Sequence, residues 1–181
     1  MFVEGISDQI AVEAVAARLD RNLAAERVLV LPVGGAHGIG RHLAHFGPGG
    51  LNLPIAGLCD EGEEVVFRRA VERSGCGDVR SRTDLERFGF YVCIPDLEGE
   101  LIRAAGVERF EAELATQGDL GAFRTLQKQP AWRGARPEQQ LRRFLGSGAR
   151  RKLRYARLLS AAMPIERIPR PLRGVLAAVG S

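Results

Sequence analysis

Short apolar runs alternate with amphipathic segments along the first hundred residues. Runs that predict strands occur at residues 1–4, 27–33, 54–59 and 90–94. Helical spacing of apolar residues follows at 8–20, after the glycines of 34–40, at 63–74 and at 97–105. This alternation is typical of an α/β fold with a parallel sheet. Because Val28 to Leu31 are all apolar, we expect the second strand to be buried on both faces.

Three of the predicted strands run into carboxylates. Glu4 ends the first strand and Asp8 lies in the first turn of the following helix, Asp60 ends the third strand, and Asp96 and Glu98 follow the fourth. Each acid taken alone could be a solvated turn residue. The carboxyl ends of parallel strands meet at one edge of a sheet, where open α/β folds build their sites. The recurrence therefore predicts a divalent-metal site there.

Beyond Val107 the pattern is helical, and glycines and prolines separate the helices. A chain of 181 residues is long enough for one α/β domain with an appendage but short for two full domains. We expect an α/β core over residues 1–106 and a helical, basic extension over 107–181 that packs on it.

The net charge of +4 conceals an uneven distribution along the chain. Residues 1–123 hold 12 Lys and Arg against 20 Asp and Glu, whereas residues 124–181 hold 14 against 2. An acidic cluster beside a basic surface suggests a metal site next to a polyanion, most simply nucleic acid; the alternative is a coding bias toward arginine. The residues expected to contact nucleic acid are Lys128, Arg150, Arg151, Arg154 and Arg157.

Other classes of site are not favoured. The loop Gly34 to Gly40 has neither dinucleotide nor P-loop spacing, so we expect no nucleotide site, although a backbone nest for phosphate stays open. His42 and His45 lack a third ligand. The three cysteines have no C-x-x-C spacing and are expected to be reduced. Without an apolar run of about 20 residues or a leader, we expect a cytoplasmic protein with no membrane contact.

The ordered motifs Val3-Glu4-Gly5-x-Ser7-Asp8, Gly34-Gly35, Asp60, Asp96-Leu97-Glu98 and a late basic helix resemble the TOPRIM domain. The similarity is greatest to the nuclease domain of the OLD (overcoming lysogenisation defect) family. The resemblance implies a TOPRIM-like, Rossmann-like sheet of four parallel strands flanked by helices. It also implies an endonuclease that hydrolyses phosphodiester bonds with Mg²⁺ or Mn²⁺, by a two-metal route and on DNA rather than RNA. OLD nucleases carry an ATPase domain, so an ATPase partner would act in trans.

Within that resemblance, each motif residue takes a role. Glu4, Asp8, Asp60 and Glu98 correspond to metal ligands, and Glu4, Asp60 and Lys152 to catalytic residues. Lys152 is one of only two lysines and heads a segment similar to the family's K-G-x-F-A helix. No tyrosine stands near the acidic motifs, which favours hydrolysis over strand passage.

The main departure from the family pattern is Gly62, which stands where the D-x-D motif has its second aspartate. We expect Glu63 or Glu64 to substitute from the following turn; if neither does, metal affinity and turnover would be reduced. A positive φ, which would let the chain turn into the helix, is the expected backbone reason for the glycine. Two alternatives to a nuclease stay open, namely a non-catalytic nucleic-acid-binding TOPRIM module and a phosphate-binding α/β domain.

Overall fold

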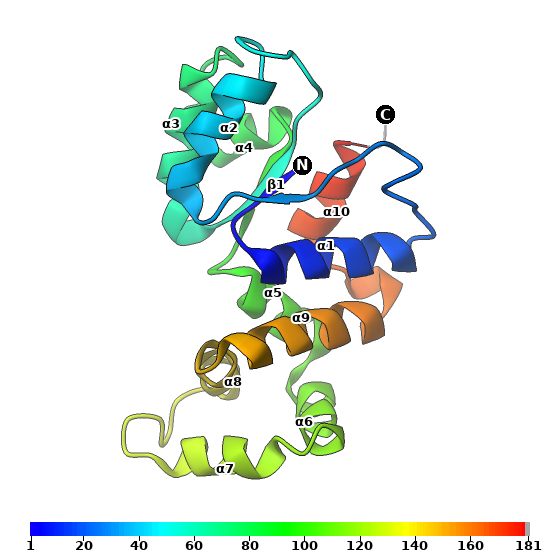
Figure 1. Ribbon diagram of the computed structural model, residues 1–181. Helices are drawn as coiled ribbons and strands as arrows, with labels where there is room; N and C mark the ends of the chain where they lie inside the picture. Colours follow the sequence, from blue (N-terminus) through cyan, green and yellow to red (C-terminus); the bar gives the residue numbers. More distant parts are fainter. Residues whose placement is uncertain (180–181) are drawn as a thin grey trace.

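The computed structural model describes residues 1–179, and Figure 1 shows their arrangement. Four short parallel strands form one sheet in the order β2-β1-β3-β4. The strands are β1 Phe2–Val3, β2 Leu31–Pro32, β3 Gly57–Asp60 and β4 Phe90–Cys93. The helices are α1 Ile6–Arg18, α2 Ile39–Phe46, α3 Glu64–Arg73, α4 Arg82–Arg87, α5 Leu97–Ala105, α6 Val107–Thr116, α7 Leu120–Lys128, α8 Pro137–Gly146, α9 Ala149–Ala162 and α10 Arg170–Ala177, with short 3-10 turns at Ala36–Gly38, Glu61–Glu63 and Ile165–Arg167. The predicted four-stranded α/β fold is confirmed.

Helices cover both faces of the sheet. Successive strand residues point to opposite faces: Cys59 packs with α2, α3 and α4, whereas Leu58 packs with α1, α5 and the C-terminal helices. Figure 1 shows α2, α3 and α4 on one side of the strands and α1 and α10 on the other. The sheet is thus the middle of three layers, and its carboxyl edge lies between them.

The C-terminal helices join the core through α9 and α10. Helix α9 runs alongside α1, and α10 packs on β4 (Figure 1). Gly174 lets α10 approach closely, because a Cβ there would lie 2.2 Å from the Tyr91 ring. Tyr155 and Leu159 of α9 are buried in the same cluster as Val12 of α1. This packing brings the first turn of α9 to the first turn of α1.

The second strand is shorter and more exposed than the sequence indicates. It spans only Leu31–Pro32 and lies at the edge of the sheet, so one side has no neighbouring strand. Leu29 is 65% exposed. An apolar run predicts a strand covered on both faces only if the strand is central, and here the expectation of full burial was wrong.

The glycine-rich loop after β2 is a packing turn. Gly34 and Gly35 have φ values of 73° and 97°, a conformation in which residues with a Cβ are strained. The Gly35 amide donates to the Glu4 carbonyl at 3.0 Å, and a Cβ on Gly38 would lie 2.3 Å from the Val33 carbonyl oxygen. These contacts support the packing role over a phosphate nest.

Cys59 and Cys93 are buried, Cys76 is half-buried, and none of the three forms a disulfide. Burial raises the pKa of the Cys93 thiol well above its usual value, so this thiol is protonated at neutral pH. No helix within residues 1–179 is long and apolar enough to cross a membrane.

Candidate metal centre

Four acidic side chains from separate segments reach the carboxyl edge of the sheet. Glu4 follows β1, Asp8 lies in the first turn of α1, Asp60 ends β3, and Glu98 lies in the first turn of α5. Electrostatic coupling joins them, because the negative charges of the other three all raise the pKa of Asp60. The structure therefore brings together all four residues that the resemblance assigns to metal binding.

In three of these carboxylates, one oxygen is held in place by a hydrogen bond from a backbone amide. Glu4 Oε1 accepts from the Asp60 amide at 2.7 Å, a bond that ties the end of β1 to the end of β3. Asp60 Oδ1 accepts from the Leu97 amide at 3.1 Å, and Asp8 Oδ2 accepts from the Gly5 amide at 2.7 Å. Within residues 1–179 the second oxygen of each makes no hydrogen bond. Those oxygens are the available ligands.

Lys152 enters the same site from the first turn of α9. Its Nζ lies 3.1 Å from Glu98 Oε1, and Glu98 is only 7% exposed. Burial alone would lower the pKa of Lys152, but the negative charges of Glu98, Asp8 and Asp60 raise it. Lys152 is therefore cationic at neutral pH and offsets part of the local negative charge.

The remaining negative charge is poorly compensated. Burial, followed by repulsion from Glu4, Asp8, Asp96 and Glu98, raises the pKa of Asp60 to about 8. Burial raises the pKa of Asp8 to about 6, and burial together with Glu63 and Glu98 raises that of Glu4. One ammonium cannot balance so many carboxylates, and a divalent cation would restore each to its ionised form.

The donor set fits a hard cation in type and position. All the available ligands are carboxylate oxygens, which Mg²⁺ and Mn²⁺ prefer, and they line an open edge that water can reach. Within the described residues no three Asp, Glu, His or Cys side chains are already at metal-ligand spacing. A bound cation would have to draw the carboxylates together, with water completing its coordination.

The segment after Asp60 shows how the chain accommodates Gly62. This glycine does not have a positive φ, and a Cβ on it would meet no atom within 4 Å. Glu64 pairs with Arg82 at 2.6 Å and is turned toward α4. The negative charge of Glu63 instead lies close enough to Glu4 to raise its pKa. The expectation of a positive φ was wrong, and Glu63 is the better placed substitute for the missing acid.

The basic residues predicted to contact nucleic acid fall into two groups. Lys128, Arg150 and Arg157 are exposed. Arg154 pairs with Asp119, while Arg151 donates to the Phe144 carbonyl at 3.2 Å and lies over the Phe144 ring at 4.0 Å. The latter two therefore hold α9 against its neighbours.

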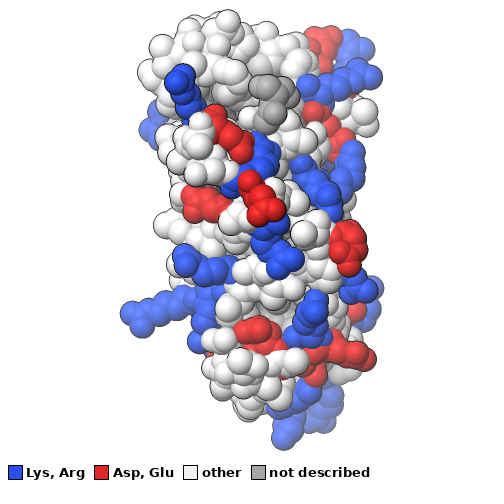
Figure 2. Space-filling view, turned by 90° about the vertical axis from the view of Figure 1, so that its right-hand side faces the viewer, with Lys and Arg blue, Asp and Glu red and all other residues white. Residues whose placement is uncertain are grey.

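Three other arginines of residues 124–181 pair with acids of residues 1–123. Arg142 binds Asp96 at 2.5 Å, Arg124 binds Glu111 at 2.6 Å, and Arg170 binds Glu86. Figure 2 shows one side of the molecule, on which basic and acidic side chains are interspersed. Part of the charge asymmetry along the sequence is thus used in ion pairs between helices, and the pairs of Arg142 and Arg170 join the extension to the core.

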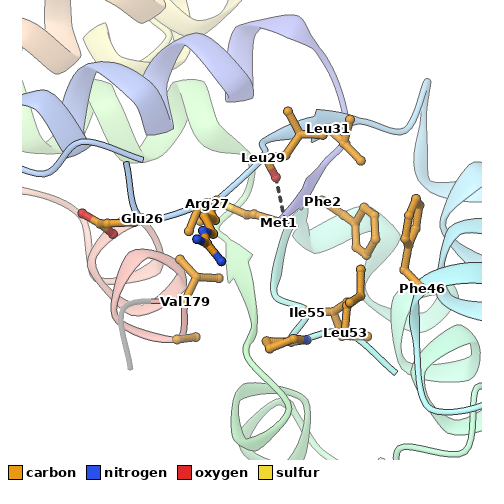
Figure 3. A pocket seen from close by; sticks show the side chains of 13 residues that line it. Met1, Phe2, Glu26, Arg27, Leu29, Leu31, Phe46, Leu53, Ile55 and Val179 are labelled. Carbon is orange, nitrogen blue, oxygen red and sulfur yellow. Dashed lines mark hydrogen bonds between the residues drawn. The ribbon is translucent and has the colours of Figure 1, made fainter. Parts of the chain in front are cut away.

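An apolar cavity of about 620 Å³ lies at the opposite edge of the sheet from the acidic side chains. Figure 3 shows Met1, Phe2, Leu29, Phe46 and Leu53 around it, at the amino ends of the strands. Parallel α/β sheets place their chemistry at the carboxyl edge. The apolar cavity is therefore separate from the candidate metal centre.

Comparisons with known proteins bear on the family and the fold. Residues 1–61, which include Glu4, Asp8 and Asp60, match the family model described as "Overcoming lysogenization defect protein-like, TOPRIM domain". The predicted resemblance is confirmed over that segment. Glu98 and Lys152 lie outside it, so their roles rest on the geometry and on the sequence resemblance.

Solved structures of OLD proteins share the fold. The C-terminal region of the Xanthomonas campestris pv. campestris OLD protein is 24% identical, with a TM-score of 0.75, over 99% of this chain and 92% of that one. The C-terminal region of the Burkholderia pseudomallei OLD protein is 20% identical, with a TM-score of 0.76, over 99% and 95%. No curated protein matches the sequence.

Proposed function

We propose that this chain is a divalent-metal-dependent nuclease of the OLD-like TOPRIM type that hydrolyses phosphodiester bonds in DNA. The observation that carries the proposal is the convergence of Glu4, Asp8, Asp60 and Glu98 with Lys152 at one edge of a parallel sheet. The match of residues 1–61 to the TOPRIM model supports it.

Each side chain has a distinct task in this proposal. Glu4, Asp8, Asp60 and Glu98 would hold Mg²⁺ or Mn²⁺, with two ions matching the number of carboxylates. Bound there, such ions supply an activated water and stabilise the leaving oxygen. Lys152, kept cationic by its acidic neighbours, stabilises the charge that develops on the phosphorus oxygens. The amides of Asp60 and Leu97 hold their carboxylate partners in place.

A non-catalytic nucleic-acid-binding module is the second candidate, because of the contacts of Arg82. This arginine pairs with Glu64 and, at 3.4 Å, with Glu61, so two of the three glutamates around Gly62 are engaged. Glu63 alone then has to compensate for the glycine. If it does not, the site would bind metal weakly and the chain would bind DNA without cutting it.

Cleavage of supercoiled plasmid separates these candidates. We expect purified protein to nick the plasmid with Mn²⁺ or Mg²⁺, and we expect chelator to stop the reaction. Glu4→Gln and Asp60→Asn should each abolish nicking, whereas the matched control Glu108→Gln, at an exposed acid of α6, should leave it unchanged. Nicking that survives both site variants would contradict the site assignment. DNA binding without nicking under every condition would favour the non-catalytic module.

We propose that an ATPase is the protein partner of this site, because residues 34–40 lack the spacing of a P-loop and OLD-like nucleases act with an ATPase. Adding such a partner with ATP should then change the nicking rate, while the partner alone should leave the plasmid intact.

A further inference from the structure

A polar cavity of about 510 Å³ opens directly beside the candidate metal centre. Glu98, Lys152 and Asp96 line one part of it, and Trp132, Arg142 and Arg143 line another. The volume lies within the range of about 300–1,000 Å³ that holds a small organic ligand. The cavity therefore adjoins the lysine of the site and has an aromatic ring in its wall.

Trp132 is held firmly although it lies in the loop between α7 and α8. Its carbonyl accepts from Gln140 Nε2 at 2.8 Å, and the buried Gln140 also accepts from Gln127 of α7 at 2.7 Å. The indole packs partly on the main hydrophobic cluster and also lines the cavity. The Gln140 bond therefore anchors the backbone of Trp132, and packing against the hydrophobic cluster orients the ring at the wall of the cavity.

The two arginines of the cavity differ in how they are engaged. Arg142 is tethered to Asp96 at 2.5 Å, yet its side chain stays 48% exposed. Arg143 is exposed and forms no ion pair within residues 1–179. Guanidinium groups suit phosphate oxygens, and both sit on the same turn of α8 that faces the cavity.

We propose that this cavity binds an unpaired nucleobase, stacked on Trp132, while Arg142 and Arg143 contact the adjacent phosphates. The inference rests on the proposed function, because it places the base next to the carboxylates that would act on the backbone. A base inside a duplex already stacks on its neighbours and has no free face. The substrate class that fits is therefore single-stranded DNA, or a duplex with unpaired nucleotides at the cut site.

Trp132 provides its own reporter, because it is the only tryptophan of the chain. Stacking of a thymine base on the indole quenches its fluorescence. We would titrate the full chain with oligothymidylate and with a blunt-ended, fully paired duplex of the same length, in chelator and again in Ca²⁺. Polarisation of labelled DNA would measure the affinity separately, so that binding and stacking are distinguished.

Oligothymidylate should quench Trp132 in at least one of the two buffers, and the fully paired duplex should bind without comparable quenching. Trp132→Ala should weaken binding of the single strand by about tenfold, in line with the loss of one stacked base, and should weaken binding of the duplex much less. Trp132→Phe retains a ring and keeps the fold if the alanine variant is unstable; it should retain part of the preference for single strands. Arg143→Gln should weaken binding of single-stranded DNA, whereas the matched control Arg109→Gln, which replaces an exposed arginine of α6, should not.

The inference is overturned if neither the single strand nor the duplex binds, or if both quench the Trp132 fluorescence equally. It is also overturned if Trp132→Phe and Trp132→Ala both leave the affinity for single strands unchanged. These readouts need no turnover. Quenching without cleavage under any metal would remove the proposed nuclease function but keep the nucleobase cavity. Cleavage without quenching would keep the nuclease function and remove the cavity.

Discussion

Replacing Asp60 by asparagine should make the metal-free protein more stable at pH 8. Burial and repulsion from Glu4 and Asp8 raise the pKa of Asp60 to about 8. An acid whose pKa is higher in the folded than in the unfolded chain stabilises the fold when protonated. That contribution is complete below the unfolded value of 3.8 and is lost as the pH rises through about 8. Asparagine removes the charge and keeps an oxygen that can accept from the Leu97 amide.

The size of the effect follows from the linkage relation. One pKa unit corresponds to about 1.4 kcal/mol, so the full shift would cost the ionised form at most about 6 kcal/mol. Water reaches the open edge of the site, and the neighbouring carboxylates share the repulsion. We therefore expect about 2 kcal/mol to separate the variant from the wild type at pH 8, and about 0.5 kcal/mol at pH 5.

Denaturant unfolding in chelator at pH 5 and pH 8 measures this difference. Saturating Mg²⁺ should then stabilise the wild type more than Asp60→Asn, because only the wild type offers the full set of ligands. Glu108→Gln serves as the control for losing an exposed acid. A variant that is less stable than the wild type at pH 8 in chelator, or a difference that does not change with pH, would refute the electrostatic argument.

Further substitutions test individual residues of the site and of α9. Gly62→Asp should tighten Mn²⁺ binding in a calorimetric titration, because its Cβ meets no atom within 4 Å and the added carboxylate supplies a further ligand. Unchanged affinity would show that Glu63 already fills the position. Lys152→Gln should reduce the cleavage rate by about 100-fold at unchanged DNA affinity, as expected for loss of one charge-stabilising donor, and a loss of affinity instead would make Lys152 a binding residue. Replacing Arg150 and Arg157 by glutamine should flatten the slope of log DNA affinity against log salt concentration by about 0.9 for each phosphate contact that is lost. Arg154→Gln should mainly lower the melting temperature, because it breaks the ion pair with Asp119. The reverse pattern would contradict this division between DNA contacts and structural contacts.

The sequence predicts the β-α alternation and the acids at strand ends because both depend on local patterns. Hydrophobic runs, glycines and the carboxylates that follow them give the strands, and parallel topology then places Glu4 and Asp60 at one edge. The exposure of Leu29 was not predictable in this way, because a strand's place in the sheet depends on tertiary pairing.

The contacts of the C-terminal helices were harder to predict than the strands. A basic helix indicates nucleic acid when it is viewed alone, but Arg151 contacts Phe144 of the preceding helix and Arg154 contacts Asp119, which is 35 residues away. Trp132 gave only a weak sequence signal for a site, because its role depends on the side chains that surround it in three dimensions. A single tryptophan flanked by arginines is the only cue the sequence holds.

The most direct test of the metal centre is a crystal structure with bound Mn²⁺, located by anomalous scattering. The account predicts a peak at the carboxyl edge of the sheet, within coordination distance of Glu4 and Asp60 and next to Asp8 or Glu98, and loss of that peak in Glu4→Gln. The absence of a peak there at saturating Mn²⁺, or a peak only at other carboxylates, would contradict it.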